Sequence, residues 1–199
     1  MSTLILATQN AHKVEEFTGL LAPWTVIPLP DNVDLPPELG ETFAENALEK
    51  ARTAVAATGR AAIADDSGIV ADALDGRPGV RSARFAGEDA TDEENLALFI
   101  EQVPAGSSIA YVCVIAYVDP RTGTERIVEG RCTGTMAEAP RGEGGFGYDP
   151  IFIPDDQPDP ADPRRRTMAE LSPAEKAAVS HRGRAARELR VVLGLDDAA

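Results

Sequence analysis

The sequence predicts a globular protein in which short strands and amphipathic helices follow one another, as one large domain or two small lobes. Its 199 residues are enough to bury a substantial core. Hydrophobic residues make up 43% of the chain and charged residues 26%, a balance typical of soluble globular proteins. Apolar spacings typical of strands and of helices recur along the whole chain, without an internal repeat or a domain linker.

The charge balance argues against some classes of partner. A formal net charge of -14 disfavours sequence-independent binding of DNA or RNA, because such binding needs a basic face. A small anionic substrate remains compatible, since a locally positive pocket can exist in an acidic protein. We therefore expect no nucleic-acid partner.

The chain also carries no sign of export or membrane insertion. No apolar run approaches the roughly 20 residues that span a bilayer. The start of the chain lacks the basic region of a signal peptide. Cys113 and Cys132 lie in strand-like segments, as is typical of reduced core thiols. We expect a cytoplasmic protein that does not bind membranes.

The chain opens with a strand at residues 4–7, a polar turn and a helix at residues 11–21. A helix N-terminus that follows a strand can bind an anion. The polar groups of this turn are Thr8, Asn10, His12 and Lys13. The segment is either a phosphate cradle, with Lys13 as a point charge, or an ordinary helix start without a glycine-rich loop.

An acidic loop and a capped helix follow a second strand at residues 24–29. Within the loop, Glu38 and Glu41 are either metal ligands or solvated acids. Thr42 and Glu45 have the spacing of a capping box, so we expect a helix from there to about residue 58.

The stretch from Ala61 to Gly87 is the centre of the predicted site. A short apolar strand at residues 61–64 is expected to end in Asp65-Asp66-Ser67-Gly68, before another short strand at residues 69–74. Neighbours on a strand point to opposite faces, so the two acids should have different roles. A carboxylate in a cleft can bind magnesium or accept a proton from water. The alternative is a polar turn that uses Asp and Gly for its geometry.

The second half of the chain predicts a helix at residues 92–102 and a long β-hairpin at residues 109–135 that is suited to self-association. The stretch RGEGGFGYD at residues 141–149 places glycines around two aromatic rings. It is either a loop that stacks on a planar base or a flexible loop whose rings pack on the core. Residues 154–166 form a loop or lid, and the arginines at its end are either functional or simply solvated.

A further helix is predicted to begin at Ser172, with Pro173 at its first position and Glu175 completing a capping box. Lys176 and His181 lie about 140° apart on a regular helix. They can share a site only if the helix breaks near Ser180 or if a ligand sits at the helix edge.

Five motifs in this order resemble the inosine triphosphate pyrophosphatase family, the RdgB-type pyrophosphatases of non-canonical purine nucleoside triphosphates. They are LILATQNAHKVEEF, ETFAENALEKA, ADDSGIVADALDGRPGVRSARFAG, GGFGYDPIF and LSPAEKAAVSHRGRA. Each motif is weak alone, but they follow one another in the family's order from residue 4 to residue 185, so the match extends over nearly the whole chain. The first turn departs from the family pattern, because Gln9 stands where the family often has glycine.

The resemblance implies a fold and an activity. The implied fold is α/β: a long twisted mixed β-sheet flanked by helices, forming two lobes around a central cleft within a single domain of residues 1–199. The implied enzyme is a homodimer that uses Mg²⁺. It hydrolyses ITP, dITP and XTP to the monophosphate and pyrophosphate, which removes deaminated purines from the nucleotide pool.

The resemblance also implies roles for individual residues. Asp66 is expected to be the catalytic proton acceptor and a magnesium ligand. Glu38 is the expected second ligand, with Glu41 as the alternative. The residues expected to hold the triphosphate are Thr8, Gln9, Asn10, Ala11, His12 and Lys13. Those expected to contact the rest of the nucleotide are Ser67, Phe146, Gly147, Tyr148, Asp149, Lys176, His181 and Arg182.

Two other functions compete with this one. A Maf-like pyrophosphatase would act on modified pyrimidine nucleotides, but the GGFGYD loop and the PAEKAAVSHRGRA tail argue against it. A nucleotide-binding regulatory module would have lost catalysis, but the intact acids and Lys13 argue against that.

Overall fold

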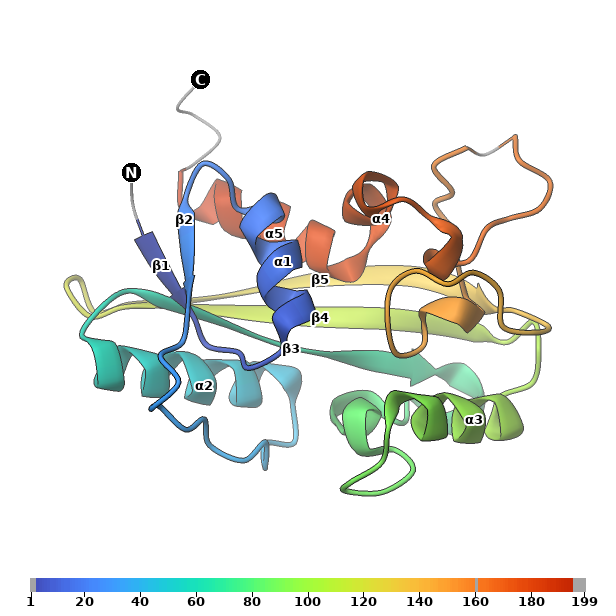
Figure 1. Ribbon diagram of the computed structural model, residues 1–199, viewed down its shortest axis with the longest axis horizontal. Helices are drawn as coiled ribbons and strands as arrows, with labels where there is room; N and C mark the ends of the chain where they lie inside the picture. The colour runs from blue at the N-terminus through green and yellow to red at the C-terminus, as the bar shows by residue number, and fades with distance from the viewer. Residues whose placement is uncertain (1–2, 160, 195–199) are drawn as a thin grey trace. The chain divides into compact units, whose positions relative to one another are not determined.

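A computed structural model describes residues 3–159 and 161–194. Its strands are β1 (Thr3–Leu6), β2 (Thr25–Pro28), β3 (Ala62–Ala71), β4 (Ser108–Asp119), β5 (Thr124–Met136) and β6 (Phe152–Pro154). Its α-helices are α1 (Ala11–Leu20), α2 (Phe43–Thr58), α3 (Asp92–Gln102), α4 (Pro173–Val179) and α5 (His181–Val192). Figure 1 shows these elements along the chain.

The strands form one mixed sheet in the order β2-β1-β3-β4-β5-β6. β1 runs parallel to both of its neighbours, with Leu4 opposite Val26 and Leu6 opposite Ile63. β4 and β5 are adjacent strands joined by a tight turn at residues 120–123, and β6 is antiparallel to β5. The mixed α/β sheet implied by the sequence is therefore confirmed.

The chain divides into two compact units. Unit 1 contains residues 1–66, 113–130 and 185–199, and unit 2 contains residues 67–112 and 131–184. The chain passes from unit 1 to unit 2 between Asp66 and Ser67, inside β3. The expectation of a single domain over residues 1–199 remains a prediction.

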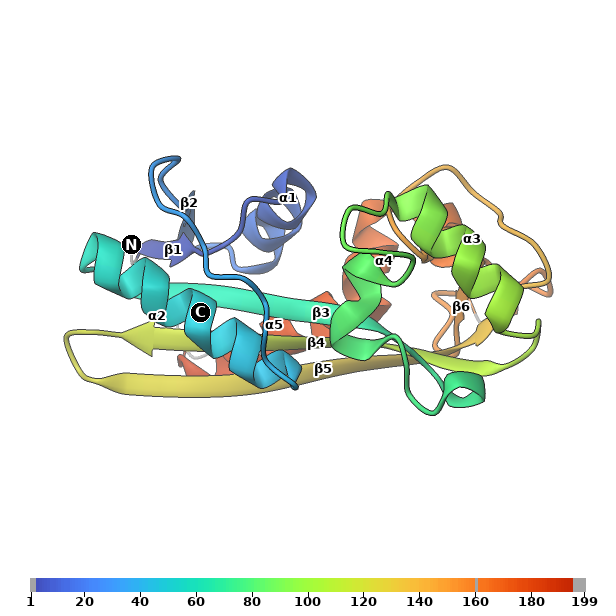
Figure 2. The ribbon, with the colours of Figure 1, turned by 90° about the horizontal axis from the view of Figure 1, so that it is seen from below.

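In unit 1, successive side chains of each strand pack on opposite faces of the sheet. Leu4 and Leu6 of β1 point to one face and join a core cluster with Phe17 of α1 and Leu189 of α5. Ile5 is buried on the opposite face, which α2 covers with alanines at positions 47, 51 and 54. Figures 1 and 2 show α2 on one side of the sheet and α5 on the other.

Unit 2 has its own apolar core. Phe99 of α3 and the ring of Tyr148 meet edge to face at 5.1 Å. Both belong to a buried cluster with Ile69 of β3, Tyr111 of β4 and Val179 of α4. The Tyr148 hydroxyl donates to the Ser82 carbonyl at 2.8 Å, so this aromatic residue of the glycine-rich stretch is tied into the core.

The helix limits follow the predicted signals closely. Thr42 and Glu45 form the capping box of α2, and Gly59 ends that helix with a positive φ of 65°. Ser172 and Glu175 form the capping box of α4. Among residues 3–159 and 161–194, no helix has the length and apolar character needed to cross a membrane.

The predicted strand end at Asp65 is wrong, and so is the separate strand at residues 69–74. Residues 65–68 lie in the middle of the ten-residue strand β3, which is followed by a 3-10 turn at Asp72–Leu74. The polar residues do not end the strand because its neighbours continue beside it, and because both acids find cationic partners in the folded protein.

Gly68 of β3 is a packing requirement that can be tested. A Cβ at this position would collide with the Gly79 carbonyl and the Ser82 hydroxyl, and the first of these is backbone that cannot turn away. We predict that Gly68→Ala lowers the free energy of unfolding by about 2 kcal/mol through overpacking. The measurement is urea-induced unfolding followed by circular dichroism.

Gly19→Ala is the matched control for that experiment. Gly19 lies on the exposed side of α1, and a Cβ there meets nothing within 4 Å. The same substitution should stabilise the protein by up to about 1 kcal/mol through helix propensity. Equal effects of the two substitutions would contradict the packing argument.

Candidate active site

The first strand-to-helix turn is organised by Asn10, which caps α1. Its side-chain oxygen accepts from the backbone N–H groups of His12 at 2.9 Å and Lys13 at 3.3 Å. Its own N–H donates to the Thr8 hydroxyl at 3.2 Å. The turn therefore has a fixed shape without a glycine, and the exposed Gln9 is accommodated in it.

A pocket of about 470 Å³ flanks the Thr8–Gln9 turn. Its other walls come from α1 and from the loop after β2, and include Val14, Leu29 and Val33. The carboxyl ends of parallel strands β1 and β2 meet here, which is where α/β sheets commonly bind ligands.

Lys13 forms an ion pair with the first acid of β3. Its ammonium lies 2.8 Å from Oδ2 of Asp65, whose side chain is fully buried. Ile63 and Asp65 are two residues apart, so Asp65 shares the face of β3 that packs against α1 and α5. Asp65 thereby holds the charge of Lys13 next to the turn that begins α1.

Asp66 points to the opposite face and meets α2. Its Oδ2 accepts from the side-chain amide of Asn46 at 2.8 Å, and its Oδ1 lies 3.9 Å from the Lys50 ammonium. Lys50 also donates to Glu38 Oε1 at 2.6 Å. The two acids of β3 thus have different partners, as the alternation of side chains predicted.

Burial and charge act against each other at this cluster. Burial raises the pKa of Asp66, and the charge of Glu38 adds to the rise, against the lowering effects of Lys50 and Asn46. Burial by itself would lower the pKa of Lys50, but Asp65, Asp66 and Glu38 together raise it. Asp66 is therefore a stronger base than an exposed aspartate, and Lys50 stays charged at neutral pH.

Asp149 organises the second group of predicted site residues, in unit 2. Its Oδ2 accepts from the Lys176 ammonium at 2.8 Å and from the Phe146 backbone N–H at 3.1 Å. Its Oδ1 accepts from the Tyr111 hydroxyl at 3.2 Å. A Cβ on Gly145, where φ is 73°, would collide with the same carboxylate, so the glycine makes room for Asp149.

The Phe146 ring is flanked by two cations. The Lys176 ammonium lies 5.0 Å and the Arg182 guanidinium 5.4 Å from its centroid. The Arg182 guanidinium also donates to the Ser67 hydroxyl at 2.9 Å, which places Ser67 in this group. The ring thus lies against two cationic groups, and base stacking by Phe146 stays a prediction.

A break in the helix places Lys176 and His181 on two different helices. α4 ends at Val179, Ser180 is extended with a ψ of 159°, and α5 begins at His181. Of the two arrangements left open by the sequence, the break near Ser180 is confirmed. His181 is 4% exposed, and its ring stacks on Tyr111 at 4.5 Å.

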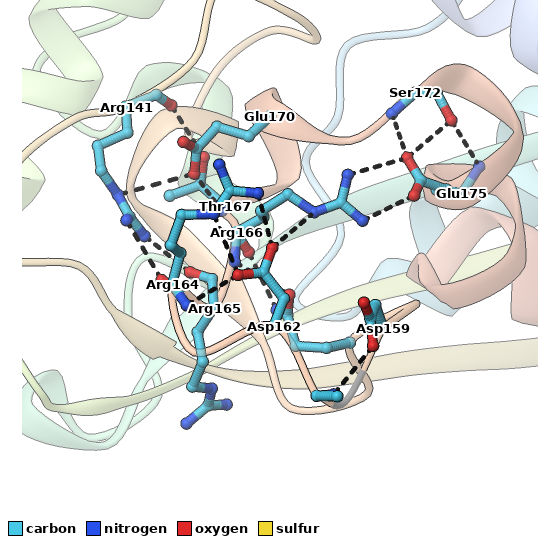
Figure 3. A network of polar contacts seen from close by, with 12 residues as sticks. Arg141, Asp159, Asp162, Arg164, Arg165, Arg166, Thr167, Glu170, Ser172 and Glu175 are labelled. Carbon is cyan, nitrogen blue, oxygen red and sulfur yellow. Dashed lines mark hydrogen bonds and ion pairs between the residues drawn. The ribbon is translucent and has the colours of Figure 1, made fainter.

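The arginines at residues 164–166 are not simply solvated. Figure 3 shows them in a polar network that reaches the start of α4. Arg166 makes a two-pronged contact with Glu175, at 2.6 and 3.2 Å, and Arg164 pairs with Asp162 at 2.8 Å. The side chain of Arg141 donates to the carbonyl of Arg165 at 2.8 Å. The loop is thereby fastened to the helix that carries Lys176.

Comparison with known proteins identifies the family. The sequence model of the Ham1 family matches residues 4–192. The chain belongs to the Ham1 family. It is 47% identical over 199 residues to a dITP/XTP pyrophosphatase of Geobacillus kaustophilus, covering 95% of this chain and 93% of that protein. It is 45% identical over 203 residues to a dITP/XTP pyrophosphatase of Frankia alni, covering 96% of each.

A solved structure supports the same family. The HAM1 protein from Coxiella burnetii matches with a TM-score of 0.81 and 40% sequence identity, covering 98% of this chain and 99% of that one. The family resemblance seen in the five motifs is therefore confirmed, and the Maf-like alternative is set aside.

The structure places the predicted residues of this Ham1 protein in two groups. Unit 1 holds the residues expected to bind phosphate and metal, namely Thr8, Gln9, Asn10, Ala11, His12, Lys13, Glu38 and Asp66. Unit 2 holds those expected at the base, namely Ser67, Phe146, Gly147, Tyr148, Asp149, Lys176, His181 and Arg182. Within residues 3–159 and 161–194, no group of three or more His, Cys, Asp or Glu is arranged as a metal site.

Sequence reasoning missed three residues of these groups: Asn46, Lys50 and Tyr111. Asn46 and Lys50 are four apart and fall on the inward face of α2, beside the buried alanines. For Asn46 and Lys50, the sequence did hold a signal, namely two polar residues four positions apart on an otherwise apolar helix face. Tyr111 gave no such signal, since it lies in the apolar run at residues 109–118 of β4.

The contribution of Lys50 to the stability of the protein can be tested. Its side chain is 7% exposed and is the shared cation of Glu38 and Asp66. We predict that Lys50→Met lowers the free energy of unfolding at pH 7 by about 3 kcal/mol, because it leaves the buried carboxylate of Asp66 and the partly exposed one of Glu38 uncompensated. Since the pKa of Lys50 is raised on folding, its contribution is present at neutral pH and is lost as the pH rises to strongly alkaline values.

The pH dependence and a neighbouring variant provide the controls. The difference between wild type and Lys50→Met should shrink as the pH falls through the raised pKa of Asp66, since a protonated carboxyl group needs no cation. Arg52 lies on the same helix as Lys50, and Arg52→Met removes its exposed ion pair with Glu125 of β5. This loss should be much smaller than that of Lys50→Met, because solvent screens exposed ion pairs. Similar losses for the two variants would contradict the claim.

Proposed function

We propose that this Ham1 protein hydrolyses dITP, XTP and ITP to the corresponding monophosphate and pyrophosphate, removing them from the nucleotide pool. Relatives that match nearly the whole chain at 45–47% identity are dITP/XTP pyrophosphatases. The observation that carries the proposal is that the predicted site residues form two groups with different chemistry. Acids and lysines gather around Asp66, whereas an aromatic ring and cations gather around Asp149.

The group around Asp66 has the properties that hydrolysis of a phosphoanhydride requires. The oxygen of water bonds to phosphorus, the bridging P–O bond between the α- and β-phosphates breaks, and pyrophosphate leaves. Asp66 takes the proton of the water, a role that suits a buried carboxylate with a raised pKa. Lys13 and Lys50 supply positive charge for the phosphate oxygens.

Glu38 and Asp66 fit a magnesium ion. Mg²⁺ is commonly bound by one or two carboxylates together with substrate phosphates. These two side chains already share the Lys50 ammonium, so their oxygens face a common position that attracts a cation. Glu41 is exposed and lacks that connection, which favours Glu38. Bound Mg²⁺ supplies charge that neutralises the phosphate oxygens during hydrolysis.

The group around Asp149 suits a 6-oxo purine. Phe146 can stack on the base, and Lys176, His181 and Arg182 can donate hydrogen bonds to its 6-oxo group. A 6-amino purine leaves such donors unpaired, which can reduce kcat/KM by several orders of magnitude. Rejection of GTP needs a further barrier at position 2 of the base, for which no residue is assigned.

The remaining expectations are a homodimer and a cytoplasmic location. The hairpin of β4 and β5 supports the first, because it presents an exposed apolar residue, Ile127. Two buried cysteines, Cys113 and Cys132, are typical of a protein from a reducing compartment. Sedimentation would report the oligomeric state.

Asp66→Asn tests the proposed chemistry. The substitution keeps the shape and the contact with Asn46 but removes the base, so turnover of dITP should fall at least about 100-fold. Binding of dITP should be largely retained, because the base-side group is unchanged. The measurements are pyrophosphate release and calorimetric binding. Asp72→Asn, at an exposed acid just after β3, should leave both unchanged.

The wild-type substrate panel decides between the functions. Pyrophosphate released from dITP, XTP and ITP, with little from ATP or GTP, is the expected result. Release of orthophosphate would contradict cleavage between the α- and β-phosphates. Binding of dITP without any turnover would favour the regulatory module instead.

A further inference from the structure

Tyr111 is a buried residue of β4 to which the proposed chemistry assigns no role. Its side chain lies among three others of unit 2. The ring stacks on that of His181, with centroids 4.5 Å apart and 14° between the planes. Its ring also stacks on that of Phe152, at 4.5 Å and 26°. The residue is 7% exposed, so it is a supporting group rather than a surface one.

The Tyr111 hydroxyl fixes the orientation of the Asp149 carboxylate. It donates to Oδ1, while Oδ2 accepts from Lys176 and from the Phe146 backbone. A carboxylate whose oxygen accepts a fixed hydrogen bond cannot rotate freely about its Cβ–Cγ bond. Tyr111 therefore keeps Oδ2 turned toward Lys176 and Phe146.

The Tyr111 ring fixes the plane of the His181 imidazole. The rings of Tyr111 and His181 are nearly parallel. The Phe152 ring also stacks on the Tyr111 ring and so restrains its orientation. The plane of an imidazole sets the directions in which its nitrogens can donate or accept. Tyr111 thus reaches each of the predicted base contacts Lys176, Phe146 and His181, either directly or through Asp149.

The hydroxyl stays a donor under ordinary conditions. Burial raises the pKa of Tyr111 well above its usual value, and the neighbouring Asp149 raises it further. The hydrogen bond to Asp149 is therefore present throughout the pH range of an enzyme assay.

We propose that Tyr111 is a positioning residue for base recognition, which orients Lys176, Phe146 and His181 toward a 6-oxo purine through Asp149 and the stack on His181. This role rests on the proposed function and extends it to a residue that the base need not touch. It predicts a defect confined to the base side of the substrate, with the phosphate side unaffected.

Tyr111→Phe is the decisive variant, because it keeps both stacks and removes only the hydroxyl. Loss of one buried hydrogen bond to a charged group should raise the KM for dITP and the dissociation constant of IMP by about 5–10-fold. The affinity for pyrophosphate, measured by the same calorimetry, should stay within about twofold, and so should kcat.

Tyr117→Phe is the matched control. Tyr117 lies six residues further along β4, is equally buried at 7% exposed, and donates to another carboxylate, that of Asp119, at 3.3 Å. It belongs to unit 1, whereas the predicted base-side residues belong to unit 2. Its loss should change no affinity by more than about twofold.

A double variant tests the route through Asp149. If the hydroxyl acts by orienting that carboxylate, Tyr111→Phe should add less than about twofold to the IMP defect of Asp149→Asn. Additive defects would contradict this route.

The outcomes separate the positioning role from the proposed function. Wild-type IMP affinity in Tyr111→Phe, or equal losses for IMP and pyrophosphate, would overturn the positioning role, because the first shows no effect and the second a general structural one. Failure of the wild-type protein to hydrolyse dITP would overturn the proposed function. The IMP and pyrophosphate affinities would still test Tyr111, since neither measurement requires turnover.

Discussion

Two adjacent buried carboxylates in one strand are the constraint on which the candidate site depends. Asp65 and Asp66 both lie within β3, where an isolated charge would be strongly unfavourable. The pleat of the strand sends them to opposite faces, so each needs a cation from a different helix. Lys13 from α1 meets Asp65, and Lys50 from α2 meets Asp66. The helices on the two faces of the sheet are thereby linked to one chemical feature.

Asp149 plays the corresponding role in unit 2. One carboxylate accepts from Lys176, from the Phe146 backbone and from Tyr111, so it joins the glycine-rich stretch to α4 and to β4. Both groups follow the same principle, in which a buried acid collects donors from several elements. In the first the acid is proposed to react, whereas in the second it is proposed only to hold other groups in place.

Most local structure could be read from the chain. The capping boxes at Thr42 and Ser172 and the glycine stop at position 59 depend on groups within a few residues, so their spacing alone indicates the helix limits. The opposite orientations of Asp65 and Asp66 also follow from strand geometry. The course of β3 could not be read in this way. In sequence, the four residues from Asp65 to Gly68 resemble a turn. Only the neighbouring strands and the lysines that pair with the two acids explain why they continue a strand.

The sequence by itself determined the family, the kinds of element and which residues carry reactive or charged groups, because these depend on motif identity and on local spacing. Only the tertiary structure decided how those residues are partnered. Asn46, Lys50 and Tyr111 lie 20, 16 and 38 positions from the acids they contact, Asp66 for the first two and Asp149 for the third. Such pairings are set by the packing of α2 on β3 and of β4 against the glycine-rich stretch, and no local pattern encodes the distances between elements.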